Sequence, residues 1–286
     1  MFHKGVGKLN NMMIKNLLQQ FLIEDLQQRD LTSETIFPRN YESAATIYAK
    51  ENGIFCGASI IDMTYALLDE RITVTLHVAD GESVDQNEEI ATITGPVRAI
   101  LSGERLVLNL IQRMSGIATM THRAVHTLNN SDIKITDTRK TAPGLRMFDK
   151  YAVTCGGGYN HRHGLYDGVM IKDNHIAFAG SITTAVERVR SQIGPMVKIE
   201  IETETEEEVK EAVQNDVDII MFDNRTPDEI ISLKRHVPHH ILTEASGGIT
   251  ITELSGYSKT NVDFISLGFL THSVCALDIS LSMKEE

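Results

Sequence analysis

The chain has 286 residues, of which 42% are hydrophobic and 23% are charged, an ordinary globular composition that corresponds to about two domains. Its formal net charge of -12 argues against nucleic acid or an anionic membrane as a partner. No apolar run reaches the roughly 18 residues of a membrane span, the start of the chain lacks the apolar segment of a signal peptide, and the cysteines form no CxxC pair. We therefore expect a cytoplasmic protein that binds neither nucleic acid nor membrane.

The first half of the chain predicts a small domain of α+β layers over residues 13–128, preceded by a loose N-terminal extension over residues 1–12. Apolar residues at i, i+3 and i+4 predict helices over 14–26, 58–68 and 101–128. Short β-rich runs bounded by turn residues predict strands over 45–49, 72–78 and 89–94. The long last helix would connect this domain to the rest of the chain.

Residues 129–286 show a different rhythm, in which short β-branched runs alternate with helical segments. The predicted strands lie at 133–136, 169–171, 197–201, 219–222, 241–243 and 264–267. The predicted helices lie at 182–193, 206–214, 227–235 and 251–257. Repeated βα units indicate a parallel sheet that curls into a barrel, and six strands are fewer than a complete eight-stranded barrel needs. We therefore predict an α/β barrel of parallel strands that is closed or nearly closed.

Polar residues follow almost every predicted strand of this barrel. They include Arg139 and Lys140 after the first strand, Lys172 after the second, Glu202 after the third and Asp223 after the fourth. Because the C-terminal ends of barrel strands meet at one mouth, these side chains are expected to converge there. That mouth is the predicted active site.

Charge is unevenly distributed along the barrel half. Residues 137–175 contain six Lys and Arg against four Asp, a local net charge of +2 in an acidic chain. Residues 196–231 contain twelve acidic residues against three basic ones, a local net charge of -9. Most of the second group suits a solvated helix face, with acids near a helix N-terminus. The first group predicts a local cationic patch.

The residue types in the predicted mouth leave several chemistries open. Arg139 and Lys140 suit an anion clamp, since Arg offers a bidentate fork and Lys a compact charge. Glu202 and Asp223 suit Mg²⁺, which binds through carboxylates together with substrate phosphates. Lys140 or Lys172 could form a Schiff base, although neither is flanked by an obviously apolar segment. Histidines 161, 163 and 175 lack the spacing of a structural zinc site.

Several long segments make the chain resemble a known family. They are Gln112-Arg113-Met114-Ser115-Gly116, Thr138-Arg139-Lys140-Thr141-Ala142-Pro143-Gly144, His161-Arg162, Ile171-Lys172-Asp173-Asn174-His175, Asp223-Asn224 and Glu244-Ala245-Ser246-Gly247-Gly248. Together they strongly resemble the quinolinate phosphoribosyltransferase family, from about residue 20 to the C-terminus. The glycine-rich turn usual in that family is replaced here by Gln27-Gln28-Arg29.

The resemblance implies a fold, a reaction and an assembly. The fold is an N-terminal α/β sandwich followed by an incomplete α/β barrel. The reaction joins quinolinate to 5-phosphoribosyl-1-pyrophosphate with Mg²⁺ and yields nicotinate mononucleotide, pyrophosphate and CO₂ in NAD biosynthesis. The assembly is a homodimer or a hexamer in which Arg105 is contributed across the subunit interface.

The resemblance also implies roles for individual residues. The quinolinate-binding residues would be Arg105, Arg139, His161, Arg162 and Lys172. Lys140, Glu202 and Asp223 would be catalytic, with Lys140 reaching toward the phosphoribosyl donor and the two carboxylates also binding substrate. Glu202 and Asp223 would hold Mg²⁺ directly or through water or substrate. The 5′-phosphate would be bound by Ser246, Gly247, Gly248 and Gly268, with His272 nearby.

Some alternatives remain open from the sequence. Glu200 and Glu202 lie on the same strand face, and we favour Glu202 because it is nearer the C-terminal end. The chain could instead be a molybdenum-transport-associated paralogue of the same fold. A Schiff-base lyase using Lys172 and a noncatalytic ligand-binding protein are the remaining hypotheses.

Overall fold

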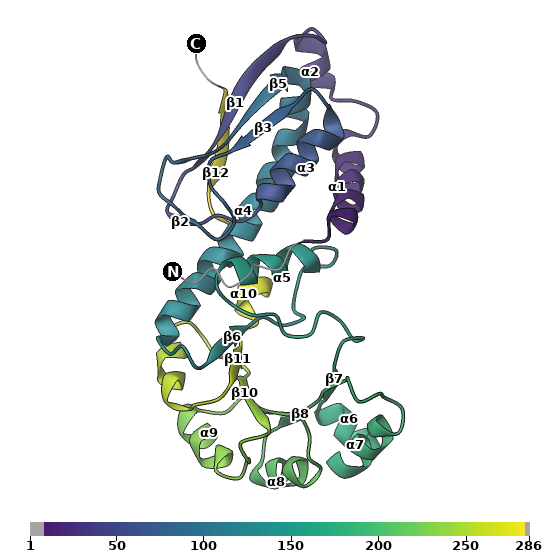
Figure 1. Ribbon diagram of the computed structural model, residues 1–286, viewed down its shortest axis with the longest axis vertical. Helices are drawn as coiled ribbons and strands as arrows, with labels where there is room; N and C mark the ends of the chain where they lie inside the picture. Colours follow the sequence, from purple (N-terminus) through teal and green to yellow (C-terminus); the bar gives the residue numbers. More distant parts are fainter. Residues whose placement is uncertain (1–8, 284–286) are drawn as a thin grey trace. The chain divides into compact units, whose positions relative to one another are not determined.

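The computed structural model describes residues 9–283 and divides into two compact units, each assembled from separate stretches of sequence (Figure 1). The first unit contains the chain up to residue 122, residues 147–157 and the chain from residue 274. The second unit contains residues 123–146 and 158–273. This differs from the predicted division at residue 128, because one helix and the last strand of the barrel half belong to the first unit.

The first unit combines an antiparallel sheet with helices. Its strands are β1 (Glu42–Ala49), β2 (Gly53–Ile54), β3 (Thr73–Leu76), β4 (Ser83–Val84), β5 (Glu89–Pro96) and β12 (Ile279–Met283). Its helices are α1 (Asn11–Leu26), α2 (Leu31–Ile36), α3 (Ala58–Leu68), α5 (Arg146–Cys155) and α4 (Val97–Leu128) up to residue 122. The structure confirms the sandwich character of this part of the chain.

The main sheet of the first unit runs in the order β12-β1-β5-β3, and all its pairs are antiparallel. Ala45, Ile47 and Ala49 of β1 are fully buried, whereas Glu42 is exposed. Strand β12, drawn in yellow in Figure 1, pairs along β1 from Ala49 to Ala45. Residues 279–283 therefore complete a sheet whose first strand lies more than 200 residues earlier.

Helix α1 begins earlier than predicted. The Asn10 side chain accepts hydrogen bonds from the backbone N–H groups of Met12 and Met13, so it caps a helix that starts at Asn11. Residues 11 and 12 are thus helical rather than part of a loose extension, while residues 1–8 of the predicted extension lie outside the described part of the chain. The predicted apolar stripe is confirmed, because Ile14 and Leu18 are fully buried.

Helix α5 is attached to α4 by a buried ion pair within the first unit. The Arg113 Nε and Nη2 atoms each lie 2.8 Å from one carboxylate oxygen of Asp149. The Asp149 side chain is 0% exposed, so the carboxylate has exchanged water for a planar fork of two charged hydrogen bonds. This pairing gives α5, which follows the first strand of the barrel in sequence, a place in the first unit.

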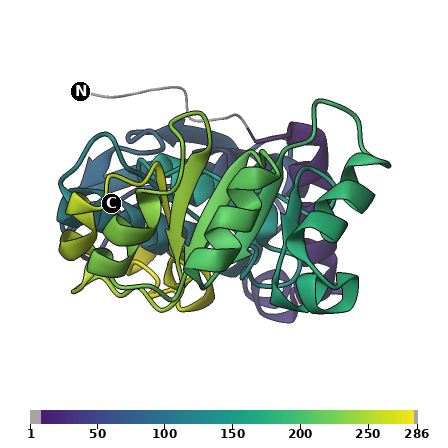
Figure 2. The same cartoon turned by 90° about the horizontal axis from the view of Figure 1, so that it is seen from below.

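The second unit is a curved parallel sheet with helices on its outer side. Its strands are β6 (Lys134–Thr136), β7 (Val169–Ile171), β8 (Ile199–Thr203), β9 (Ile219–Asp223), β10 (Leu242–Ser246) and β11 (Phe264–Ser266). Its helices are α6 (Asp173–Ala179), α7 (Ile182–Arg190), α8 (Glu206–Gln214), α9 (Pro227–Lys234), the 3₁₀ helix η1 (Leu254–Lys259) and α10 (Phe269–His272). Figure 2 shows helices such as α8 lying in front of the strands when the unit is seen from below.

The six strands of the second unit are ordered β6-β11-β10-β9-β8-β7, and every pair is parallel. Within residues 9–283 no ladder joins β6 to β7, so the sheet does not close. The incomplete, open α/β barrel implied by the resemblance is confirmed. None of the helices in the described range is both long enough and apolar enough to cross a bilayer.

The local prediction works best where caps are written in the sequence. Helix α8 has the predicted bounds, and Thr205 and Glu208 form a capping box at its start. Helix α9 begins at Pro227, the predicted first residue, and Thr226 caps it. Strands β8 and β10 instead end two and three residues later than predicted, because the interior of this barrel is polar near its mouth and carboxylates continue the strands.

Candidate active site

Most predicted site residues of the second unit lie in or just after the C-terminal ends of the parallel strands, as expected for a barrel mouth, whereas His161 and Arg162 lie in the loop between α5 and β7. The predicted site residues form three groups: the arginine pair (Arg139, Arg162), the acid-lysine group (Lys172, Glu202, Asp223) and the glycine group (Lys140, Ser246, Gly247, Gly248, Gly268, His272). His161 lies beside Arg162 and is treated separately below. Arg105 lies on α4 in the first unit, where its side chain is 64% exposed and 4.0 Å from Glu104.

The arginine pair brings two positive charges close together in the second unit. Within the described residues, the Nε atoms of Arg139 and Arg162 are buried and have no hydrogen-bond partner. Burial and then the positive charge of Arg139 lower the pKa of the Arg162 guanidinium. Unsatisfied buried N–H groups on two neighbouring cations are costly, so the pair is suited to receive an anion.

The loop that carries Arg162 is held by two aspartates. Asp137, which is fully buried, accepts hydrogen bonds from the His161 backbone N–H at 2.9 Å and from the Asn160 amide at 2.6 Å. Asp167 accepts from the backbone N–H groups of His163 and Gly164 at 2.6 and 2.9 Å. Burial alone would raise the pKa of Asp167, but these hydrogen bonds lower it. The loop is therefore fixed before any ligand binds.

The acid-lysine group joins three neighbouring strands. Lys172 follows β7, and its Nζ atom lies 2.5 Å from the Glu202 carboxylate in β8. Asp223 ends β9, and its pKa is raised by burial and then by the charge of Glu202, while Lys172 opposes the shift. One ammonium thus faces two carboxylates. Their oxygens are the donor type that a hard divalent cation prefers, so Glu202 and Asp223 fit such an ion.

The glycine group is shaped by close approaches that a side chain would block. Gly247 follows β10 with φ +88°, and a Cβ atom there would lie 2.3 Å from the Asn224 Oδ1 atom. A Cβ atom on Gly268 would lie 3.1 Å from the His272 ring and 3.2 Å from the Lys140 side chain. Lys140 and His272 are therefore neighbours across Gly268. Small residues with exposed backbone N–H groups at such turns suit a phosphate.

A buried cluster of His161, Glu200 and Glu244 lies within the barrel and was missed as a unit by the sequence analysis. The His161 Nε2 atom lies 3.1 Å from Glu200 Oε2 and 3.5 Å from Glu244 Oε2. Both glutamates are at least 96% buried, and their Oε1 atoms have no hydrogen-bond partner in the part of the chain described. The only sequence signal was the alternation that puts Glu200 on the same strand face as Glu202.

The cluster retains a proton that isolated groups would release at neutral pH. Burial lowers the pKa of His161, but hydrogen bonds to Glu200 and Glu244 outweigh it and raise the pKa to about 10. Burial also raises the pKa of Glu200, and Glu244 adds to the effect. The His161 Nδ1 atom accepts the Arg162 backbone N–H at 2.8 Å, so the ring proton lies on Nε2. The Nε2 N–H is directed at the two carboxylates, so His161 is not placed as a metal ligand.

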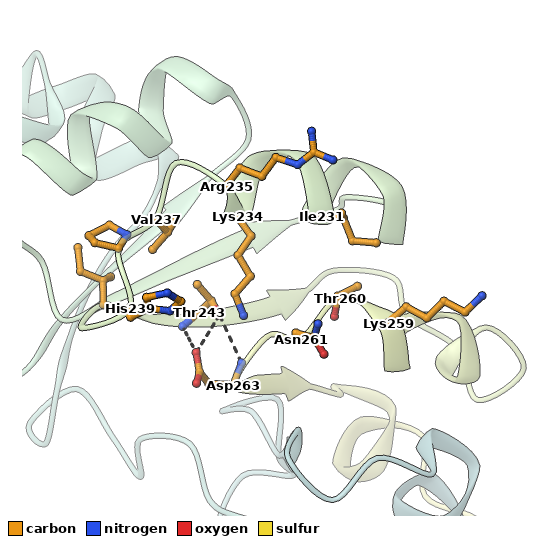
Figure 3. Close-up of a pocket in the computed structure, with 12 residues that line it drawn as sticks. Ile231, Lys234, Arg235, Val237, His239, Thr243, Lys259, Thr260, Asn261 and Asp263 are labelled. Atoms are coloured by element: carbon orange, nitrogen blue, oxygen red, sulfur yellow. Dashed lines mark hydrogen bonds between the residues drawn. The ribbon is translucent and has the colours of Figure 1, made fainter.

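Two cavities of the second unit differ in what lines them. One of about 290 Å³ is lined by His161, Arg162, Glu200 and Glu244, among other residues. Another of about 510 Å³ contains none of the predicted site residues. In Figure 3 the Lys234 side chain points into the second cavity toward Asp263, which accepts two hydrogen bonds from Thr243. Its lining comes partly from the N-terminal sides of β10 and β11, where barrel residues usually serve stability.

Two family models match the sequence of this chain, one in each half. The C-terminal domain model of quinolinate phosphoribosyl transferase matches residues 117–282, and the N-terminal domain model matches residues 30–115. The chain belongs to the quinolinate phosphoribosyltransferase family. Membership of this family explains why a sandwich and an open barrel occur in one chain.

Individual family members are similar over almost the whole chain. A relative from Bacillus subtilis, described as a probable carboxylating nicotinate-nucleotide pyrophosphorylase, is 54% identical over 96% of this chain and 95% of its own length. The NadC structure from Streptococcus pyogenes is 36% identical, with a TM-score of 0.93 over 98% of this chain and 100% of that one. The nicotinate-nucleotide pyrophosphorylase structure from Francisella tularensis is 35% identical, with a TM-score of 0.92 over 99% and 100%.

Proposed function

We infer that the protein is a carboxylating nicotinate-nucleotide pyrophosphorylase, a pentosyltransferase of NAD biosynthesis. It joins quinolinate to 5-phosphoribosyl-1-pyrophosphate and releases pyrophosphate and CO₂ to form nicotinate mononucleotide. The names of its relatives and its place in the quinolinate phosphoribosyltransferase family support this reaction. The molybdenum-transport paralogue is not favoured.

The arginine pair is the observation in the molecule that carries this function. Quinolinate has two carboxylates on adjacent ring carbons, and moving them out of water requires cations to offset their desolvation. Among the described residues, the buried Nε atoms of Arg139 and Arg162 have no hydrogen-bond partner, and Lys172 adds an ammonium at the end of a side chain that is 44% exposed. We assign these three residues to quinolinate binding. The exposed Arg105 would complete the pocket from the partner in a homodimer or hexamer.

The acid-lysine group suits the ribosyl transfer step. Departure of pyrophosphate leaves positive charge on the ribose, which Glu202 and Asp223 would stabilise while they bind its hydroxyls. These carboxylates would also hold Mg²⁺, which would neutralise charge on the leaving pyrophosphate when bound. Lys140 would reach the phosphoribosyl donor from beside Gly268. The 5′-phosphate would lie against the backbone of Ser246, Gly247 and Gly248.

The loss of CO₂ needs no covalent adduct with the enzyme. Once the pyridine nitrogen carries ribose it is cationic, so it can accept the electron pair left on carbon 2 when the C–CO₂⁻ bond breaks. A proton from solvent then replaces the lost carboxylate. The Lys172 ammonium is held by Glu202, which is unfavourable for a Schiff base, because that chemistry requires a neutral amine. The lyase alternative is therefore not favoured.

Product formation tests this proposal directly. The protein is incubated with quinolinate, 5-phosphoribosyl-1-pyrophosphate and Mg²⁺, and nicotinate mononucleotide and CO₂ are quantified. We expect both in equal amounts and a loss of activity with EDTA that Mg²⁺ restores. A protein that makes no product from quinolinate but uses nicotinate would contradict the proposal. Fractionation of the source cells would test the cytoplasmic location, and light scattering would test the assembly.

A further inference from the structure

The Arg162 segment and Lys172 are both held by one strand, β8. Glu202 contacts the Lys172 ammonium, and Glu200, two residues earlier on the same face, contacts the His161 ring. Residues two apart on a strand are separated by roughly 6.6 Å and point the same way. Strand β8 therefore connects two substrate-binding cations that come from different segments of the chain.

The His161 ring is held by both of its nitrogens. Nε2 faces Glu200 and Glu244, and Nδ1 accepts the backbone N–H of Arg162 at 2.8 Å. Each ring nitrogen can make one such in-plane hydrogen bond, so neither is directed at a ligand in this geometry. The ring transmits the position of a β8 carboxylate to the backbone of the next residue. This places His161 in a supporting role beside Arg162 rather than in direct contact with quinolinate.

The cost of the buried carboxylates indicates that they serve function rather than stability. Glu200 and Glu244 are 4% and 2% exposed, and one oxygen of each has no hydrogen-bond partner among the described residues. Buried carboxylates with unsatisfied oxygens destabilise a fold, and apolar residues of similar volume are often neutral or stabilising in their place. A stability role alone does not account for two of them side by side.

We propose that Glu200, together with Glu244, is a positioning residue for quinolinate: it fixes the His161 ring, His161 fixes the Arg162 backbone, and β8 thereby holds Arg162 and Lys172 at a constant separation. The proposal rests on the proposed function, because it assigns Arg162 and Lys172 to the substrate dicarboxylate. It adds the means by which the two cations keep the spacing that the two substrate carboxylates require.

The test compares Glu200→Met with Glu200→Gln and Glu200→Asp. Met fills the volume but cannot accept the His161 proton, whereas Gln keeps an acceptor at the same place and Asp keeps the charge at a shorter reach. For Glu200→Met we expect the KM for quinolinate to rise about tenfold, the loss of one well-placed hydrogen bond. The KM for 5-phosphoribosyl-1-pyrophosphate should stay within about twofold, and the thermal midpoint should be unchanged or higher. Gln and Asp should restore part of the quinolinate affinity.

A spectroscopic readout separates positioning from general damage. In ¹⁵N NMR we expect the His161 Nε2 resonance to shift between the wild type and Glu200→Met, because Nε2 loses its Glu200 acceptor. Glu207→Gln, an exposed acid on α8, is the matched control and should change none of these quantities.

The outcomes are distinguishable from failure of the reaction itself. If the wild type forms no nicotinate mononucleotide, the proposed function falls before any variant is measured. If the wild type is active and Glu200→Met keeps the wild-type KM for quinolinate, the positioning proposal is wrong. It is also wrong if both KM values rise together while the thermal midpoint falls, because that pattern describes a structural residue.

Discussion

Arginine is used in two opposite ways in the two units. In the first unit, Arg113 forms a complete fork with the buried Asp149, and both bonds are 2.8 Å long. In the second unit, Arg139 and Arg162 lie close enough for the charge of one to lower the pKa of the other. The Nε atom of each is buried and has no hydrogen-bond partner among the described residues. The difference teaches that a satisfied buried charge positions a helix, whereas an unsatisfied one is ready for a ligand.

The largest effect should come from breaking the satisfied pair. In Asp149→Ala the Arg113 guanidinium loses the partner that offsets its burial, so the free energy of unfolding should fall by about 3–5 kcal/mol. Urea unfolding followed by circular dichroism measures this loss. The double variant Arg113→Met/Asp149→Leu should regain most of it, because it removes both charges. A single-variant loss below about 1 kcal/mol would show that the pair does not hold α5.

Removing an arginine of the arginine pair should leave stability almost unchanged but weaken substrate binding. In Arg139→Met the repulsion with Arg162 disappears, so the thermal midpoint should stay within about 2 °C of wild type or rise. Quinolinate should bind about 100-fold more weakly, which is about 2.7 kcal/mol, because one charged partner of a desolvated carboxylate is lost. Titration calorimetry with quinolinate measures the affinity, and Arg235→Met, an exposed arginine after α9, is the control. Unchanged affinity in Arg139→Met would contradict the proposed anion site.

The smallest effect concerns the loop that carries Arg162. The pKa of Asp167 is lowered, so its stabilisation of the loop is present above the ordinary value of 3.8 and is lost as the pH falls through the lowered value. The backbone amide resonances of His163 and Gly164 should therefore titrate with a midpoint below 3.8. Because Asp167 is exposed, Asp167→Asn should cost at most about 0.5 kcal/mol of stability. A midpoint above the ordinary value would mean that the backbone N–H groups do not hold this carboxylate.

The sequence predicts those features of the fold and the site that depend on local pattern. Caps such as Thr205 and Thr226 define helix starts because their side chains bond to N–H groups three residues away. The order of polar residues after the barrel strands predicts that Arg139, Lys172 and Asp223 lie at one mouth. Resemblance to a family added the roles that these residues are proposed to play.

The remaining features depend on contacts between distant segments. Strand β12 is short and half polar, and only its pairing with β1, more than 200 residues earlier, makes it a strand. Strand β10 was predicted to end at Thr243, because Glu244 looks like a loop residue until the polar barrel interior is known. The contact of His161 with Glu200 joins residues that no periodicity relates. The sequence also does not predict whether a buried polar group has a hydrogen-bond partner, because that depends on residues distant in the chain.

The pairing of β12 with β1 delays completion of the first sheet until almost the whole chain has been synthesised. A ribosome delivers the strands and helices of the second unit before it delivers residues 279–283, so the unit that begins the chain is the last to be completed. Until then β1 presents an open edge to other chains, which is a hazard for aggregation. Residues 279–283 are therefore needed to complete the first sheet, and their removal would leave β1 without its partner β12.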